Sequence, residues 1–255
     1  MPGQFSASYT AQARYFHFGR VRRPRLGVIH VGITPKSDGA AEGMVNYAAS
    51  PEASVASFHL AADRNSVSRG VNDWDTAWGA PGANADGLQL EQAGTVQGRD
   101  GFLDAYSAQM IREQSARVVA DWHGRYALPL VHLSVAQVAD RSSRGFCTHY
   151  DVTRAFPTLG DHTDPDDGAV PGYPFDVLFA AAWQHPFGVP AVKHNPFDWR
   201  KEPVRFMQWS LGIPVDGRYG AQTDAILAAW QTRHGYTVQH ALTATTATDL
   251  SHYTK

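Results

Sequence analysis

The sequence predicts an α/β fold in which helices flank a central mixed β-sheet, followed by a small three-helix domain. Short apolar runs rich in β-branched residues alternate with helical patterns over most of the chain, which is typical of α/β domains. A proline-rich aperiodic stretch then precedes a compact helical pattern. With 255 residues, 43% of them hydrophobic, the chain can form one large and one small domain. We expect four segments: an N-terminal extension (1–25), a main domain (26–184), a linker (185–199) and a C-terminal module (200–255).

The predicted strands are short apolar runs bounded by turn-forming residues. The run at 26–31, LGVIHV, contains no acidic or basic side chain other than its histidine, so we expect a buried strand there. Further strands are expected at 57–62, 87–91 and 146–149.

The predicted helices of the main domain follow from the spacing of apolar residues. Residues 40–49 come after a polar loop that contains glycine, and Ser37 or Asp38 is the expected N-cap. The clearest helix is expected over 103–126, where apolar residues recur at helical spacing until a Leu-Pro pair ends the pattern. Strands that alternate with such helices imply a mixed sheet covered by helices.

The composition excludes several classes of function. Lys and Arg total 22 against 24 Asp and Glu, a net charge of −2, which disfavours a general nucleic-acid binder. No apolar run reaches the roughly 18 residues that a membrane span needs, so we expect no membrane insertion. One cysteine excludes an internal disulfide. The first residues lack the basic and apolar regions of a signal peptide, which indicates a protein made in a cytoplasm.

Four residues near predicted strand ends have the chemistry of a catalytic zinc site. Such a site needs three protein ligands and one open position. His30 and His149 end predicted strands, and Asp164 lies in a loop. Glu91 is an isolated acid in an apolar run, a setting that raises its pKa and suits a general base. Taken singly, each also has an ordinary structural interpretation: a hydrogen-bonded histidine, a salt-bridged glutamate or a turn aspartate.

The order of several short motifs from about residue 28 to 175 is more specific than any one of them. These motifs are VIH (28–30), SFHLAADR (57–64), DTAWGAPGAN (75–84), GLQLE (87–91), HYDV (149–152) and HTDP (162–165). In this order they resemble the zinc-dependent N-acetylmuramoyl-L-alanine amidases of the type-2 family, which also includes the peptidoglycan recognition proteins. The resemblance implies an α/β domain with a zinc ion, Zn²⁺, as cofactor.

The resemblance also assigns roles to individual residues. It implies that His30, His149 and Asp164 bind the zinc and that Glu91 activates the metal-bound water. The family usually has Lys two residues before the ligand Asp, where it stabilises the developing oxyanion. Here that residue is His162, whose imidazolium can supply the same charge or whose neutral ring can donate a hydrogen bond.

The second and third motifs depart from the family pattern. By resemblance we expect Trp78 and Asn84 to contact substrate. The family's Trp-His-Ala-Gly is Trp-Gly-Ala-Pro here, so Gly79 stands where a histidine is usual. Phe58 stands where the family often has Tyr, and it has no hydroxyl to contribute.

Three further residues leave alternatives open. Asp166 replaces the Gly of the family's Asp-Pro-Gly, which makes Asp166 or Asp167 a rival metal ligand. We interpret His59 as structural or as lining the cleft. Cys147 with His149 as its base could form a cysteine peptidase site, but a small buried strand residue is the favoured interpretation.

The C-terminal module has its own resemblance. Residues 204–220, VRFMQWSLGIPVDGRYG, followed by Thr223, are similar to the small three-helix peptidoglycan-binding module. Pro203 fits a first helical position, and Thr223 can cap the second helix. A third short helix is expected after Thr243.

Together the two resemblances imply zinc-dependent hydrolysis of the amide between N-acetylmuramic acid and L-alanine, with the C-terminal module binding peptidoglycan. This pairing without a signal peptide resembles a phage endolysin, which accumulates in the host cytoplasm until holin releases it to the cell wall. We expect a monomer whose partner is bacterial peptidoglycan. The alternatives are a non-catalytic peptidoglycan-binding protein and an endopeptidase that depends on Cys147.

Overall fold

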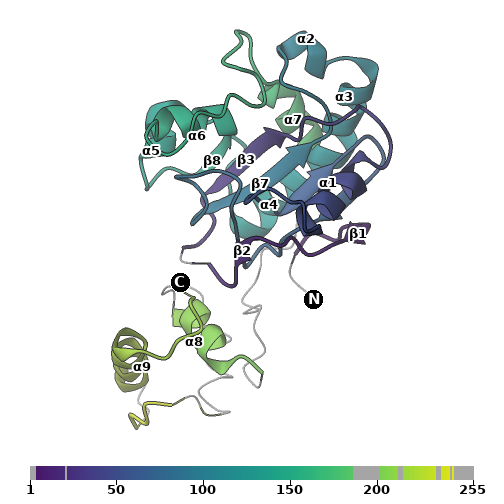
Figure 1. The fold of residues 1–255 in the computed structure, drawn as a ribbon. Coiled ribbons are helices and arrows are strands. Elements are labelled where there is room, and N and C mark those ends of the chain that lie inside the picture. Colours follow the sequence, from purple (N-terminus) through teal and green to yellow (C-terminus); the bar gives the residue numbers. More distant parts are fainter. Residues whose placement is uncertain are drawn as a thin grey trace.

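A six-stranded mixed sheet forms the centre of the main domain (Figure 1). The computed structural model describes residues 4–20, 22–185, 201–211, 215–233, 237–241 and 243. The strand order is β1-β5-β4-β7-β3-β8, with parallel pairs around β3 and β7 and an antiparallel β4–β5 pair. The strands are β1 (Tyr9–Thr10), β3 (Leu26–Val31), β4 (Leu60–Ala62), β5 (Val67–Arg69), β7 (Gly87–Gln92) and β8 (Gly145–Thr148). The predicted fold class, a mixed sheet flanked by helices, is confirmed.

The register of the central strands determines what lies at one edge of the sheet. β3 is buried along its whole length and pairs in parallel with β7 on one side and β8 on the other. His30 lies opposite Glu91, and Ile29 lies opposite Thr148. Because parallel strands end at the same edge, the last residues of all three strands come together there.

Helices cover both faces of this sheet. The helical elements of the main domain are α1 (Ala40–Ala49), α2 (Arg99–Phe102), α3 (Ala105–Gln109), η1 (Met110–Ser115), α4 (Ala116–Tyr126), α5 (Val135–Ala139), α6 (His149–Ala155) and α7 (Phe175–Ala182). Ile29 and Leu90 belong to the main core, together with residues of η1, α4 and α7. On the opposite face, Val28 packs in a second core with residues of α5 and α6. His30 follows Val28 with the period of two along β3, so it points to the α6 side.

Some boundaries differ from the predictions. The helix expected over 103–126 is divided into α3, the π-helical turn η1 and α4. Gly39, in a left-handed conformation, is the N-cap of α1, where Ser37 or Asp38 was expected. The strand expected at 57–62 covers only its last three residues.

The strand expected at 146–149 ends one residue early, and the N-terminal segment contains two strands that were not expected. His149 does not end a strand but begins α6, because Thr148 forms a capping box and accepts a hydrogen bond from the Asp151 N–H. The N-terminal segment is part of the sheets: β1 pairs with β5, and β2 (Phe16–His17) pairs with β6 (Thr76–Ala77).

The described part of the C-terminal module contains α8 (Pro203–Leu211) and α9 (Ala221–Arg233). Gln208 is buried between them, and its Nε2 donates to Asp216 Oδ1 at 2.6 Å and to Thr223 Oγ1 at 3.3 Å. Thr223 thus lies inside α9 and does not cap it. The third helix expected after Thr243 and residues 186–199 of the predicted linker lie outside the described residues. Among the helices described, none has the length and apolar character of a membrane span.

Candidate metal centre

Three predicted ligands converge at the edge where β3, β7 and β8 end. His30 is the fifth residue of β3, His149 begins α6, and Asp164 lies in the loop after it. One ligand atom from each lies within 4.8 Å of the others. His149 Nδ1 is 3.0 Å from Asp164 Oδ1, and His30 Nδ1 is 3.3 Å from Asp164 Oδ2. Two imidazole nitrogens and one carboxylate oxygen suit zinc in a catalytic site, where ligand atoms about 2 Å from the metal lie roughly 3.3 Å apart.

A buried amide orients one of the ligand rings. His30 Nε2 is 2.7 Å from Gln89 Oε1, so the Nε2–H donates to Gln89 and Nδ1 keeps its lone pair for a metal. Gln89 Nε2 in turn donates to Asn84 Oδ1 at 3.2 Å. The sequence analysis missed Gln89. Its signal is the period of two, because Gln89 and Glu91 are polar residues on the same face of a buried strand.

The protonation states of the other two ligands also favour metal binding. Burial lowers the pKa of His149 to about 4, so its ring is neutral at neutral pH. Burial alone would raise the pKa of Asp164, but hydrogen bonds from His149 and His30 hold it well below its usual range. A neutral imidazole and an ionised carboxylate are the forms that bind a metal cation.

Glu91 lies beside the ligand set without being one of its members. Its Oε1 is 3.9 Å from His30 Nδ1, and its buried Oε2 has no hydrogen-bond partner among the described residues. Burial raises the pKa of Glu91 to about 7, although the nearby His30 opposes the shift. A buried carboxylate with an unused oxygen and a pKa near neutrality is suited to accept and deliver a proton.

His162 lies at the mouth of the site. Its side chain is 52% exposed, and its ring stacks on His149 with the centroids 4.2 Å apart. His162 Nδ1 is 3.8 Å from Asp164 Oδ1. A half-exposed imidazole beside the ligands is placed to donate a hydrogen bond to a bound substrate.

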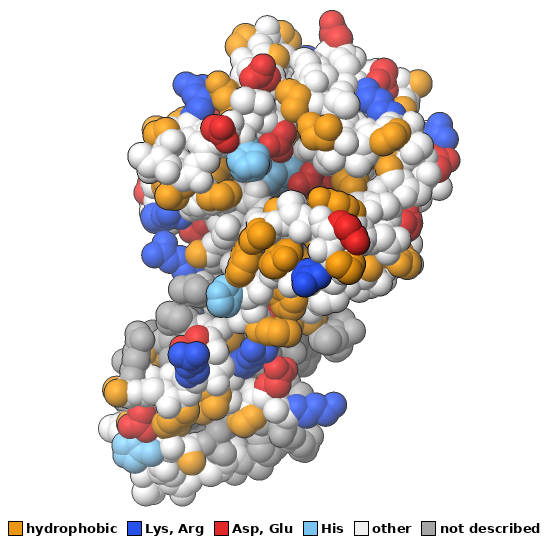
Figure 2. Space-filling view, in the orientation of Figure 1, with side chains coloured by type: hydrophobic (Ala, Val, Ile, Leu, Met, Phe, Trp, Pro, Cys, Tyr) orange, Lys and Arg blue, Asp and Glu red, His pale blue; other side chains and the backbone are white. Residues whose placement is uncertain are grey.

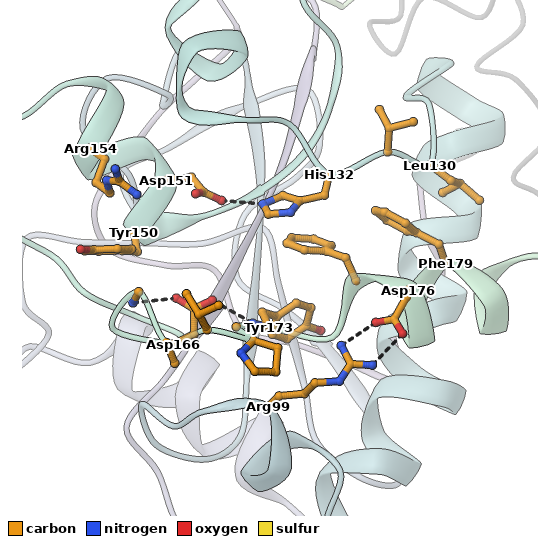
Figure 3. Close-up of a pocket in the computed structure, with 17 residues that line it drawn as sticks. Arg99, Leu130, His132, Tyr150, Asp151, Arg154, Asp166, Tyr173, Asp176 and Phe179 are labelled. Atoms are coloured by element: carbon orange, nitrogen blue, oxygen red, sulfur yellow. Dashed lines mark hydrogen bonds and ion pairs between the residues drawn. The ribbon is translucent and has the colours of Figure 1, made fainter.

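The rival ligands Asp166 and Asp167 are not part of this cluster. Asp166 accepts hydrogen bonds from the backbone N–H groups of Gly168 and Tyr173, at 3.2 and 2.8 Å. It lines a separate cavity of about 690 Å³ behind the Asp164 loop, where its bond to Tyr173 is drawn (Figure 3). Asp167 is exposed and has a φ of 50°. Of the described residues, only His30, His149 and Asp164 form a cluster of this kind.

The same cavity contains a charge pairing that the sequence analysis also missed. His132 Nε2 is 2.9 Å from Asp151 Oδ2 (Figure 3). The His132 ring stacks on Phe175 with the ring centroids 4.2 Å apart. Arg99 pairs with Asp176 at the other end of the cavity. No local pattern could reveal these pairs, because the sequence separates their partners by 19 and 77 residues.

The remaining predicted residues do not belong to the cluster of His30, His149 and Asp164. His59 is fully buried and its Nδ1 accepts the Gln89 N–H at 2.9 Å, so it is structural. Cys147 is also fully buried, and burial raises the pKa of its thiol well above the ordinary value, which is unsuited to a nucleophile. Trp78 and Asn84 line a different cavity, beside β2 and the C-terminal module.

A groove opens directly on Glu91. It has a volume of about 380 Å³ and is lined by small and apolar side chains from the loop after β3, from α1 and from the segment before β4. Ile33 and Tyr47 on its rim are 66% and 53% exposed. An apolar groove that ends at a proton-accepting carboxylate is a typical setting for a substrate.

No protein-family model matches the chain, and no curated protein is significantly similar to it. Among solved structures, the chain is similar to the hydrolase AmiA of Staphylococcus aureus in complex with its ligand, with a TM-score of 0.48 and 18% identity over 70% of this chain and 83% of that one. It is similar to a mutant endolysin from Bacillus subtilis, with a TM-score of 0.42 and 12% identity over 57% and 85%. It is also similar to the endolysin amidase LysCS from Clostridium intestinale, with a TM-score of 0.36 and 12% identity over 69% of this chain and 95% of that one.

Proposed function

We propose that this protein is a zinc-dependent N-acetylmuramoyl-L-alanine amidase that hydrolyses bacterial peptidoglycan. The observation that carries the proposal is the group of His30, His149 and Asp164 with Glu91 beside it, whose Oε2 has no hydrogen-bond partner among the described residues. The ordered motifs of the sequence resemble those of type-2 amidases, and this resemblance indicates which bond is cut. We also propose that the C-terminal module binds peptidoglycan and that the enzyme acts in host lysis, as endolysins do.

The residues divide the chemistry among them. His30, His149 and Asp164 would hold the zinc, which supplies Lewis-acid polarisation of the scissile carbonyl and a water acidic enough to react at neutral pH. Glu91 takes the proton from the attacking water on its free Oε2 and delivers it to the leaving nitrogen of L-alanine. His162 donates a hydrogen bond to the oxyanion of the tetrahedral intermediate.

The chemical ends released from purified peptidoglycan test this proposal. Digestion is expected to expose new N-terminal alanine, and this release should stop with a chelator and return with added zinc. If a different new amino end appears, and its release resists the chelator but is blocked by a thiol reagent, the activity depends on Cys147. Binding to the wall with no new end would make the protein a non-catalytic binder.

The groove beside Glu91 is expected to hold the peptide part of the substrate. Gly43 lies in α1 on this groove, and a β-carbon built there meets nothing within 4 Å. Gly43→Phe is expected to fill the groove and lower kcat/KM by about tenfold, because it removes space without a clash in the core.

Gly43→Ala is the matched control. It adds one methyl group to an exposed helical position and should raise the stability by about 1 kcal/mol without loss of activity. Kinetics on a soluble muramoyl peptide and thermal melting measure both effects. Full activity of Gly43→Phe would show that the peptide lies elsewhere.

A further inference from the structure

A cavity of about 650 Å³ lies where the main domain meets the C-terminal module. One wall is the β2–β6 ribbon and the loop after it, which contribute the aromatic residues Phe16, Phe18 and Trp78. The other wall comes from the C-terminal module and carries Arg205 and Arg218. The two walls differ in chemistry: aromatic rings on one side and guanidinium groups on the other.

Specific contacts hold these two walls together. The Val215 N–H donates to the Arg20 carbonyl oxygen at 3.0 Å, and Val215 is only 4% exposed. The Arg205 guanidinium lies 5.2 Å from the centre of the Phe18 ring. Gly19 has a φ of 78°, and a β-carbon there would lie 2.1 Å from the Val215 carbonyl oxygen. The module can approach this closely only because residue 19 has no side chain.

The aromatic wall forms a supported platform. The Trp78 ring stacks with Tyr15 at a centroid distance of 6.4 Å and meets His17 at 5.6 Å. Its backbone N–H donates to Ser57 Oγ at 2.9 Å. Trp78 remains partly exposed toward the cavity. A ring held in this way can pack against a flat apolar surface with little loss of side-chain entropy.

Polar donors surround this platform. Asn84 Oδ1 accepts hydrogen bonds from the Ala80 N–H and from Gln89 Nε2, at 2.7 and 3.2 Å. Its Nδ2 donates to none of the described residues, so it is available to a ligand in the cavity. Arg218 lines the cavity with a guanidinium. Arg205 does so as well, and its Nη1 also donates to Glu202 Oε1 at 3.2 Å. Sugar rings have flat faces of C–H groups and edges of hydroxyl and acetamido oxygens, which match rings flanked by donors.

The cavity is connected to the metal centre. Gln89 links them, because its side chain bonds Asn84 on one side and the ligand His30 on the other. Figure 2 shows apolar side chains on one face of the molecule between the histidines of the main domain and the C-terminal module. A chain of hydrogen bonds through the fully buried Gln89 thus joins the wall of the cavity to His30 inside the domain.

We propose that this cavity binds the glycan strand of the substrate, a chain of N-acetylhexosamines, so that the C-terminal module forms one wall of the substrate site. The inference rests on the proposed amidase function for its choice of polymer. Stacking on Trp78 and hydrogen bonds from Asn84 and Arg205 would hold sugars that follow the muramoyl residue at the metal centre. The module then does more than tether the enzyme to the wall, because it takes part in recognising each strand that is cut.

Calorimetry with the full chain and a hexamer of N-acetylglucosamine tests this site without requiring catalysis. The hexamer is expected to bind more tightly than the dimer, and Trp78→Ala and Arg205→Ala are each expected to weaken its binding about tenfold. Trp78→Phe and Arg205→Lys should keep most of the affinity, since they retain a ring and a charge. Trp183→Ala and Arg112→Ala, exposed residues outside the cavity, are the matched controls.

A kinetic comparison provides a second readout. The ratio of kcat/KM on long glycan fragments to that on a muramoyl peptide without further sugars should fall about tenfold in both alanine variants. Equal hexamer binding by wild type, Trp78→Ala and Arg205→Ala would overturn the proposal. If Trp78→Ala weakens hexamer binding and Arg205→Ala does not, the C-terminal module does not form a wall of the glycan site. Hexamer binding that depends on both residues, with no amide cut in any fragment, would support the glycan site and refute the amidase.

Discussion

Glu91→Gln is expected to abolish amide hydrolysis while the protein still binds zinc. The substitution keeps the shape of the side chain but removes the group that accepts a proton, and general acid–base catalysis contributes about 100- to 10,000-fold to such reactions. Glu91 is not among the three ligands, so metal content measured by atomic absorption should remain equal to that of the wild type. Release of N-terminal alanine from peptidoglycan measures the activity, and Glu91→Ala should lose it as well. An active variant would exclude Glu91 as the general base.

The same substitution is expected to stabilise the metal-free protein in a pH-dependent way. Burial raises the pKa of Glu91 from 4.5 to about 7, so the folded protein holds this proton more tightly than the unfolded chain. The free energy of unfolding therefore falls as the pH rises from 4.5 to about 7, and the full destabilisation by the Glu91 carboxylate is reached above pH 7.

Gln carries no such cost. Glu91→Gln should raise the free energy of unfolding by about 1–3 kcal/mol at pH 8 and leave it nearly unchanged at pH 4. Urea titrations with a chelator present at the two pH values measure the difference. Equal effects at both would mean that the Glu91 carboxylate is not buried in the metal-free state.

The convergence of His30, His149 and Asp164 was the most predictable feature of the candidate site, and the surroundings of these residues were the least predictable. A buried apolar strand that ends in histidine can be recognised locally, and the register of parallel strands then places His30 opposite Glu91. Thr148 and Asp151 have the spacing of a capping box, which is a local signal for the helix that starts at His149, but the apolar run before Thr148 favoured a strand. The period of two marks Gln89 as a polar residue on the same face as Glu91, but its role depends on His30, which is 59 residues away.

Trp78 and Asn84, which were predicted to contact substrate, show a different limit of prediction from sequence. The motif placed both residues in one loop, but it did not say which cavity the loop lines. In the structure that cavity also takes a wall from the C-terminal module, through Val215 and Gly19. Contacts between two segments separated by almost 200 residues have no local signal, because neither segment has a pattern that requires the other.

Asp164→Ala is expected to remove both the metal and the activity. Asp164 contacts His149 and His30, and its low pKa keeps it ionised at any pH at which the enzyme could work. Without it, two histidines remain, and zinc affinity should fall by at least about 100-fold, a larger loss than removal of a residue that only supports a ligand produces. Titration with zinc against a competing chelator measures this affinity directly.

Asp167→Asn is the control that tests the alternative left open by the sequence. Asp167 lies three residues from Asp164, is exposed, and takes part in no metal-binding cluster of the described residues. Its φ of 50° is one that Asn adopts as readily as Asp, so the substitution removes a carboxylate without backbone strain. If Asp167→Asn loses zinc and Asp164→Ala keeps it, the third ligand is Asp167 and the geometry described for the site is wrong. If only Asp164→Ala loses zinc, His30, His149 and Asp164 are the zinc ligands. The activity that Asp164→Ala loses then depends on the zinc held by these three residues.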